Sequence, residues 1–232
     1  MGLQGTFAPT KCNPFMKTIF LSMLLLAAAG KPVLAQQSDW RNERRVNLLF
    51  GLNQPLLNGF NAEVNYFHKR LAFDYSHGVS LNLNNALLDA SNRDLGIDVH
   101  IPWTTGFGVG YRFNEWFNLR AEPKWHKFEL YHQGDAQTAA NQIGAYTTFS
   151  LGVGAYANVQ PFKRQDNFLK GIMVAPSIRW WPRLASSLNN NELAFQRRSD
   201  NQTVSHQALE VGISNTPLIV NISIGYSLAW NK

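Results

Sequence analysis

The chain has 232 residues, 45% of them hydrophobic and 16% charged, and its formal net charge is +6. Its mean hydropathy of −0.22 argues against a helical membrane protein, because such proteins carry long unbroken apolar segments. Basic character is weak support for nucleic-acid binding, because the first 35 residues hold three lysines and no acid, and their loss would lower the net charge to +3. We expect no nucleic-acid partner.

The amino-terminal segment predicts a cleaved signal peptide. Met16-Lys17 precedes a run at 19–30 that is apolar except for one serine, and Val33-Leu34-Ala35 ends on a small residue that suits a cut. The run is about a dozen residues, whereas a membrane-spanning helix needs about 20, so a signal is favoured over an anchor.

The chain therefore divides into two parts. Residues 1–35 are interpreted as an over-extended start, with Met16 as the expected initiator, followed by the signal peptide. Residues 36–232 are interpreted as a single domain. The only cysteine, Cys12, lies in the discarded part, so the mature chain has no thiol, which suits an oxidising envelope compartment.

Eight strands are predicted in the mature chain from a side-chain pattern of period two. In 71–83 every odd position is apolar except His77, and the last strand alternates apolar residues with Asn, Ser and Gly. Such a strand has one apolar face and one polar face. The predicted strands are 46–53, 59–68, 71–83, 102–113, 116–131, 143–161, 168–182 and 217–230.

The connections between these strands alternate in length. If both ends of the chain lie in the periplasm, the short links, such as 68–70 and 114–115, fall on the periplasmic side, and the longer ones fall outside. This arrangement is typical of bacterial outer-membrane barrels. The sequence therefore predicts an all-β fold, a transmembrane antiparallel up-and-down barrel of eight strands with short periplasmic turns and longer extracellular loops.

Charged side chains occupy the inward-facing positions of the predicted strands. At eight strands a barrel interior is just filled by side chains, so these charges need partners, because an unpaired buried charge costs several kcal/mol. We expect a network of salt bridges that closes the lumen, with Glu122 and Arg179 as one pair, and a gate or proton-linked path as the alternative. The predicted lumen charge network comprises Glu63, Asp74, Arg112, Arg120, Glu122, Lys124, His126 and Arg179.

This architecture resembles the small outer-membrane barrels, such as the OmpA transmembrane domain, OmpX and OmpW. The resemblance covers nearly all of the mature chain and lies in strand pattern and loop lengths, without a sequence motif. It implies a monomer in the bacterial outer membrane, inserted by the barrel assembly machinery and surrounded by outer-membrane lipid and lipopolysaccharide. A small apolar-solute channel of the OmpW type is one alternative function.

An enzyme that modifies lipid A, as an acyl hydrolase or acyltransferase, is the other alternative. The candidate residues are Ser76 and His77, but neighbours in a strand face opposite ways, so these two cannot form a dyad with each other. The chain has no His-x-Ser-Asn motif. We therefore expect no catalysis, and a structural or ligand-interacting protein of the envelope.

The segment from Leu184 to Thr216 is the longest predicted connection. We interpret it as a solvated loop, and Arg197 and Arg198 within it as a possible contact for the phosphates of lipopolysaccharide. The histidines of the turns and loops lack metal-ligand spacing, so neither a metal site nor a cofactor is expected.

Overall fold

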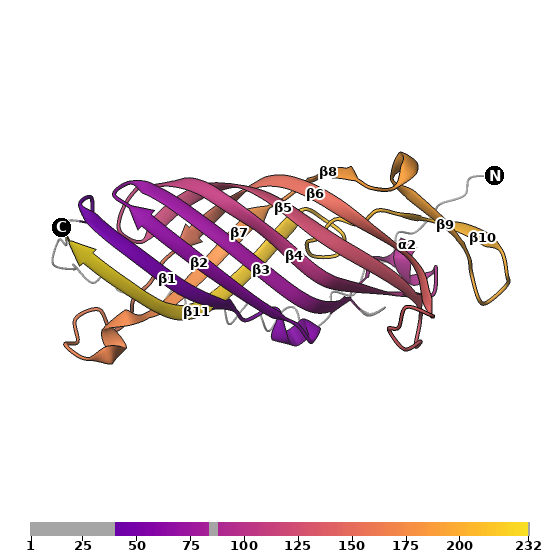
Figure 1. Ribbon diagram of the computed structural model, residues 1–232, viewed down its shortest axis with the longest axis horizontal. Coiled ribbons are helices and arrows are strands. Elements are labelled where there is room, and N and C mark those ends of the chain that lie inside the picture. The colour runs from indigo at the N-terminus through magenta and orange to yellow at the C-terminus, as the bar shows by residue number, and fades with distance from the viewer. Residues whose placement is uncertain (1–39, 84–87, 232) are drawn as a thin grey trace, which may run out of the picture. The chain divides into compact units, whose positions relative to one another are not determined.

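The computed structural model describes residues 40–83 and 88–231 (Figure 1), which belong to one compact unit, Asp39–Lys232. The predicted signal peptide lies outside the described residues. The strands that build the main sheet are β1 (Glu43–Gly51), β2 (Phe60–His68), β3 (Leu71–Leu83), β4 (Ile97–Arg112), β5 (Phe117–His132), β6 (Gln142–Ala157), β7 (Ile172–Trp180) and β11 (Leu218–Asn231).

These eight strands close into a barrel. Every strand pairs antiparallel with the next in chain order from β1 to β7, β7 pairs with β11, and β11 pairs back with β1. The predicted all-β antiparallel barrel of eight strands is thus confirmed for the described part of the chain. The remaining elements are β8 (Arg183–Ser186), β9 (Glu192–Gln196), β10 (Thr203–Gln207), α2 (Ala90–Arg93) and the short 3-10 helices η1 (Pro55–Leu57), η3 (Phe168–Gly171) and η4 (Asn189–Asn191).

The two ends of the barrel differ in their connections. Glu43 at the start of β1 pairs with Asn231 at the end of β11, and we call this the terminal end. Tight turns join β2 to β3 and β4 to β5 there, as predicted, whereas the link from β6 to β7, residues 158–171, is longer than predicted. At the opposite end, which we call the loop end, the longest connection runs from β7 to β11. Among the described helices, none is long and apolar enough to cross a membrane.

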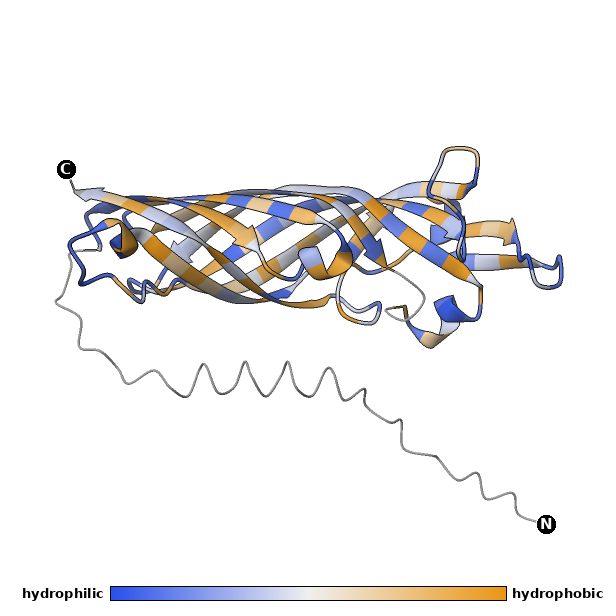
Figure 2. Cartoon of the chain, turned by 90° about the horizontal axis from the view of Figure 1, so that it is seen from below, coloured by the Kyte–Doolittle hydropathy of each residue, from blue (hydrophilic) through white to orange (hydrophobic). Residues whose placement is uncertain are grey.

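Hydrophilic and hydrophobic residues alternate along the barrel strands, as the bands of colour show (Figure 2), and buried and exposed positions alternate with them. In β5, Arg120 and Glu122 are buried while Leu119 and Ala121 are exposed. The same alternation holds in β2, where Glu63 is buried and Val64 is exposed. Period two in the sequence therefore becomes a polar interior and an apolar exterior.

The alternation reverses near the loop end in two neighbouring strands, β3 and β4. Ser80 in β3 has φ +60°, and beyond it Leu81 turns inward, although its odd position predicts the outer face. The pairing of β4 with β5 also shifts between His100 and Thr104, so that Ile101 is buried. An extra residue in one strand transfers the following side chains to the other face.

The inward residues of this upper part form an apolar core. Strands β3 to β6, which we call the tall strands, extend past β1 and β2. Their inner face packs against the long connection from β7 to β11. The core comprises Leu81, Leu88, Ile97, Val99, Ile101, Phe128, Leu130, Tyr146, Phe195, Ala208 and Leu209.

The prediction of a solvated loop at 184–216 is wrong. After Trp181 and Pro182 the chain continues as β8 along β6, and β9 then pairs with β10 in a hairpin. This hairpin buries Phe195 and His206 against the apolar core. We call the β9–β10 hairpin the cap, because it covers the inner face of the tall strands.

Candidate functional site

The centre of the barrel interior is organised around the Glu63 carboxylate. Arg120 Nη1 donates to Glu63 Oε1 at 2.8 Å, and Arg179 Nη2 donates to Oε2 at 3.4 Å. All three side chains are buried. Because β2, β5 and β7 are not neighbours in the barrel, these two ion pairs span the interior and tie three separated parts of the wall together.

Arg120 has further partners around its planar guanidinium group. It donates to Asp74 Oδ2 at 3.3 Å and to Asn65 Oδ1 at 3.1 Å. Its Cζ lies 3.9 Å from the centre of the Tyr156 ring, which is within the range of a cation–π contact. The edges and one flat face of the guanidinium are therefore engaged, which fixes its orientation.

Glu122 is held by neutral donors on β6 and the β7–β8 junction. The Tyr156 hydroxyl donates to Oε1 at 2.5 Å, and Trp181 Nε1 donates to Oε2 at 2.9 Å. Lys124 Nζ lies 3.8 Å from the same carboxylate. The predicted ion pair between Glu122 and Arg179 is therefore wrong, since the guanidinium of Arg179 pairs with Glu63 instead.

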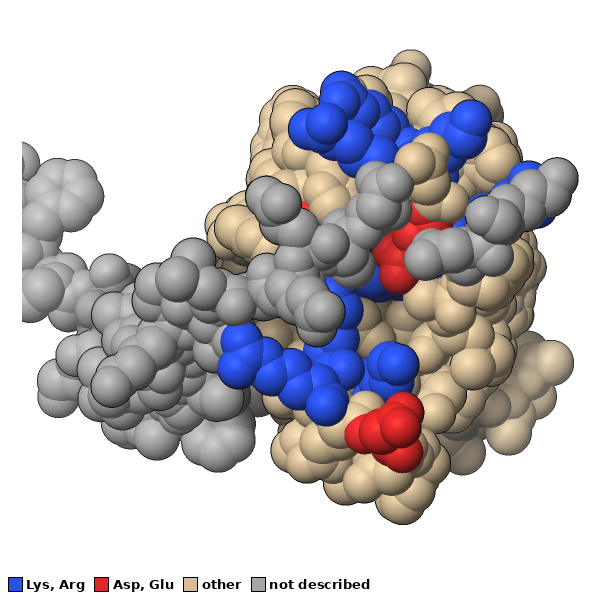
Figure 3. Space-filling model, turned by 90° about the vertical axis from the view of Figure 1, so that its left-hand side faces the viewer, with Lys and Arg blue, Asp and Glu red and all other residues tan. Residues whose placement is uncertain are grey.

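Arg112 lies apart from the central residues, at the terminal end. Its Nη2 lies 3.4 Å from Glu43 Oε2, which Arg45 Nη2 also approaches at 2.9 Å. Sequence reasoning missed Glu43 and Arg45, because it began the first strand at residue 46, although their odd positions match the inward phase of β1. Around this end Lys and Arg gather in patches on the surface (Figure 3).

His126 marks the boundary between the charged interior and the apolar core. Its side chain is fully buried, and Nδ1 lies 2.6 Å from the Thr104 hydroxyl. The His126 ring packs near the rings of Trp181 and Phe128, with centroid distances of 6.2 and 6.4 Å. Beyond His126 the inward-facing residues of β5, Phe128 and Leu130, are apolar.

A second buried polar group lies inside the cap, and sequence reasoning missed it. His206 Nδ1 is 2.8 Å from Asn92 Oδ1, and Nε2 is 3.0 Å from the Tyr146 hydroxyl. That hydroxyl also accepts a bond from the Leu209 amide at 3.1 Å. Burial lowers the pKa of His206 to about 4, while the nearby Asp89 carboxylate acts in the opposite direction.

Ser76 and His77 lie on opposite faces of β3. Ser76 is buried in the interior and its hydroxyl accepts a bond from Lys124 Nζ at 2.7 Å. His77 is exposed on the outer wall, where it pairs with Ala62 and Thr105 across the neighbouring strands. The structure does not bring the serine and the histidine together.

Arg197 and Arg198 occupy the tip of the cap. Arg197 forms an ion pair with Asp200. Arg198 donates hydrogen bonds from its two terminal guanidinium nitrogens to the carboxylate of Asp135, at 2.8 and 2.6 Å. The Arg198 guanidinium lowers the pKa of the Asp135 carboxyl below its usual range. Both arginines thus already have carboxylate partners, although Arg198 remains 61% exposed by its side chain.

The buried charged side chains of the interior form ion pairs with one another, and this arrangement suits a structural role better than catalysis. Within residues 40–83 and 88–231 no group of three or more His, Cys, Asp or Glu side chains could hold a metal ion. The six interior residues Glu63, Asp74, Arg120, Glu122, Lys124 and Arg179, which we call the central cluster, are all buried.

No family model and no curated protein sequence matches the chain. Among solved structures, it is similar to the N-terminal β-barrel domain of Pseudomonas aeruginosa OprF, with 10% identity and a TM-score of 0.39 over 81% of this chain and 98% of that one. It is also similar to Ail, the attachment invasion locus protein of Yersinia pestis, with 12% identity and a TM-score of 0.35 over 80% of this chain and 97% of that one. The assignment of the barrel rests on the strand pairing itself.

Proposed function

We propose that this chain is a non-enzymatic outer-membrane barrel whose lumen is closed, and that it acts as a structural or ligand-interacting protein of the cell envelope. The observation that carries the proposal is the central cluster, in which Glu63 joins Arg120 and Arg179 across the interior. Side chains that meet across a barrel leave no continuous path for water between them.

The outer wall supports a membrane location. Large apolar side chains are exposed on every barrel strand, for example Leu48, Phe107 and Val153, each at least half exposed. A water-soluble monomer seldom exposes so large a continuous apolar surface. In a bilayer the same surface is solvated by hydrocarbon, and the closed ring leaves no unpaired strand edge.

The apolar core supports closure at the loop end. The cap lies against the inner face of the tall strands, so that the interior is charged in the middle and apolar above. A permeating ion would have to displace the ion pairs of the central cluster and then cross the apolar core. Each of these barriers costs several kcal/mol.

One observation favours the enzymatic alternative. Ser76 Oγ and Lys124 Nζ are 2.7 Å apart, and serine–lysine pairs are known as nucleophile and base. In this geometry, however, the lysine donates to the hydroxyl, whereas a general base must accept the serine proton. Both side chains are also buried, so a lipid substrate has no route to them.

Single-channel recording in planar bilayers tests the closed lumen. The purified protein should insert, which a shift in gel migration on heating would show independently, and should give no large steady conductance. As a positive control, the double variant Glu63→Ala/Glu122→Ala removes two of the carboxylates of the central cluster and should raise the frequency of openings. A large steady conductance of the unmodified protein would refute the proposal.

Lipid A composition tests the absence of catalysis. Membranes with and without the protein should carry the same acyl pattern by mass spectrometry, and the Ser76→Ala variant should match the unmodified protein. An acyl chain that is lost or gained with the protein, and restored in Ser76→Ala, would establish the enzymatic alternative.

A further inference from the structure

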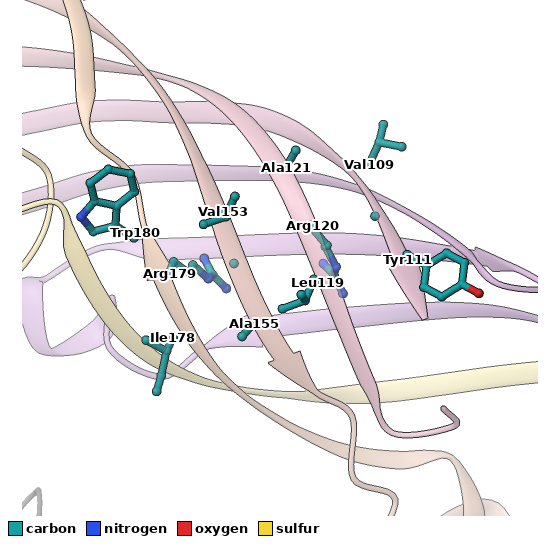
Figure 4. A pocket seen from close by; sticks show the side chains of 12 residues that line it. Val109, Tyr111, Leu119, Arg120, Ala121, Val153, Ala155, Ile178, Arg179 and Trp180 are labelled. Carbon is teal, nitrogen blue, oxygen red and sulfur yellow. The ribbon is translucent and has the colours of Figure 1, made fainter. Parts of the chain in front are cut away.

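An apolar groove hollows the outer wall of the barrel over β4 to β7 (Figure 4). Its volume is about 640 Å³, within the range of about 300–1,000 Å³ that small-molecule sites occupy. Tyr111 lies at one side of the groove and Trp180 at the other, with Ala121 and Ala155 between them (Figure 4).

The hollow follows from the sizes of residues that face each other across the strands. One outward row runs from Tyr111 to Leu119, Ala155 and Ile178. The parallel row runs from Val109 to Ala121, Val153 and Trp180. Each row therefore places one alanine among bulky side chains, and the wall between the rows sinks at these alanines.

A cation stands at the edge of the groove nearest the terminal end. Arg70, in the turn between β2 and β3, donates from Nη1 to the Tyr111 hydroxyl at 2.5 Å. The Cζ atom of Arg70 is 5.8 Å from the centre of the same ring. Arg70 is exposed, and Tyr111 links its guanidinium group to the apolar lining.

We propose that this groove binds one membrane phospholipid, with an acyl chain along the alanines and the phosphate at Arg70. Charge complementarity argues for this occupant, because guanidinium groups bind phosphate oxygens with paired, charge-assisted hydrogen bonds. The strands of a second copy would present apolar side chains to the groove, whereas a phospholipid supplies both an acyl chain for the groove and an anion for Arg70. The inference rests on the proposed membrane location.

Van der Waals packing, and not the release of water, would hold the acyl chain of the lipid in the groove. Lipid tails surround the whole outer wall, so the groove gains only by closer van der Waals contact than a flat surface provides. This contact does not distinguish one lipid class from another. The contact between the phosphate and Arg70 therefore determines which class of lipid is retained, and the groove determines the position of the acyl chain.

Native mass spectrometry of the protein released from an uncharged detergent tests the site. The probes are palmitoyl-oleoyl phosphatidylglycerol, the matching diacylglycerol without phosphate, and inorganic phosphate. We expect one bound phosphatidylglycerol, with weaker retention of the diacylglycerol and none of inorganic phosphate. Ala155→Phe, and independently Ala121→Phe, should weaken retention of phosphatidylglycerol by about tenfold, because a ring fills the hollow.

Arg70→Gln should weaken retention of phosphatidylglycerol by about fivefold and leave the diacylglycerol unchanged. Two matched controls are available. Ala62→Phe adds the same ring at an exposed outward position of β2, and Lys127→Gln removes a cation from the opposite end of β5; neither should change retention.

The outcomes separate this inference from the proposed function. A protein that shows no heat-dependent migration and does not enter vesicles would overturn the membrane location and the lipid site together. A protein that inserts, but retains phosphatidylglycerol equally in Ala155→Phe and Ala62→Phe, would overturn the lipid site alone. A dimer that Ala155→Phe dissociates would also overturn it, in favour of a second copy.

Discussion

Among single residues, Glu63 has the most consequential position, since two arginines on different strands depend on its carboxylate. Removal of one partner from a buried ion pair leaves the other charge without compensation, which typically costs about 3–5 kcal/mol. Asp74 provides Arg120 with a second acceptor, whereas Arg179 forms its ion pair with Glu63. The loss should therefore fall mainly on the β7 side of the barrel.

Glu63→Ala should lower the free energy of unfolding of the barrel by about 3–5 kcal/mol, measured by urea titration in vesicles. The matched control is Glu192→Ala on the exposed edge of the cap, where the change should stay below about 1 kcal/mol. Equal, small effects of both variants would show that the central cluster does not hold the barrel together.

Residue type and parity predicted the inward charges but not their pairing. Alternation in β2 and β5 places Glu63 and Arg120 inside from the sequence alone. Which carboxylate meets which guanidinium depends on the relative height of strands that are far apart in the sequence. That is why the predicted pair of Glu122 with Arg179 is wrong, while each residue was assigned to the interior.

Among the secondary-structure elements, two features could not be predicted from the sequence: the cap, and the reversal of inward and outward positions at Ser80. The odd apolar positions of β3 continue past Ser80, so the sequence does not reveal the positive φ at Ser80 beyond which Leu81 turns inward. In β9 and β10 only two residues per strand pack inward, among Glu, Ala, Gln, Thr and Ser, which is too short a pattern to separate from a loop. Tertiary contact with the tall strands stabilises this hairpin.

The cap should open as the pH falls from about 6.5 to about 4. Above 6.5 His206 is neutral whether the cap is closed or open, so its stability does not depend on pH there. Below 6.5 the open cap binds a proton that the closed cap excludes until about pH 4, so the closed state loses up to about 3 kcal/mol over this window. Asp89 and the Tyr146 hydroxyl face the ring, and neither offers it a full ion pair.

Amide hydrogen exchange of β9 and β10, corrected for the intrinsic pH dependence of exchange, measures this opening. His206→Gln retains hydrogen-bonding capacity without the titration and should remove the pH dependence. The control His77→Gln changes an exposed histidine on the outer wall and should leave it intact. Protection of the cap that is the same at pH 7 and pH 4.5 would contradict the prediction.

For the whole molecule, the outer wall of the barrel determines whether water or lipid is the favourable surrounding medium. Its apolar side chains are as exposed as surface residues of a soluble protein, yet they continue around a closed ring with a buried, charged interior. The number of barrel strands, the alternation and the two tight turns at the terminal end could be predicted from the sequence, since each follows from local pattern. The apolar core at the loop end could not, because it depends on the unequal heights of the strands.

Two exposed positions on β11 distinguish a bilayer from water. Ile224 and Leu218 are both 43% exposed on the outer wall, but Ile224 lies in the middle of the strand and Leu218 at its loop end. In water an arginine at either position should have a similar small effect. In a bilayer, Ile224→Arg should cost about 2–4 kcal/mol near the midplane, whereas Leu218→Arg should cost about 0–1 kcal/mol near the interface. Reversible unfolding in vesicles measures both free energies, and equal values for the two variants would mean that the wall does not lie in hydrocarbon.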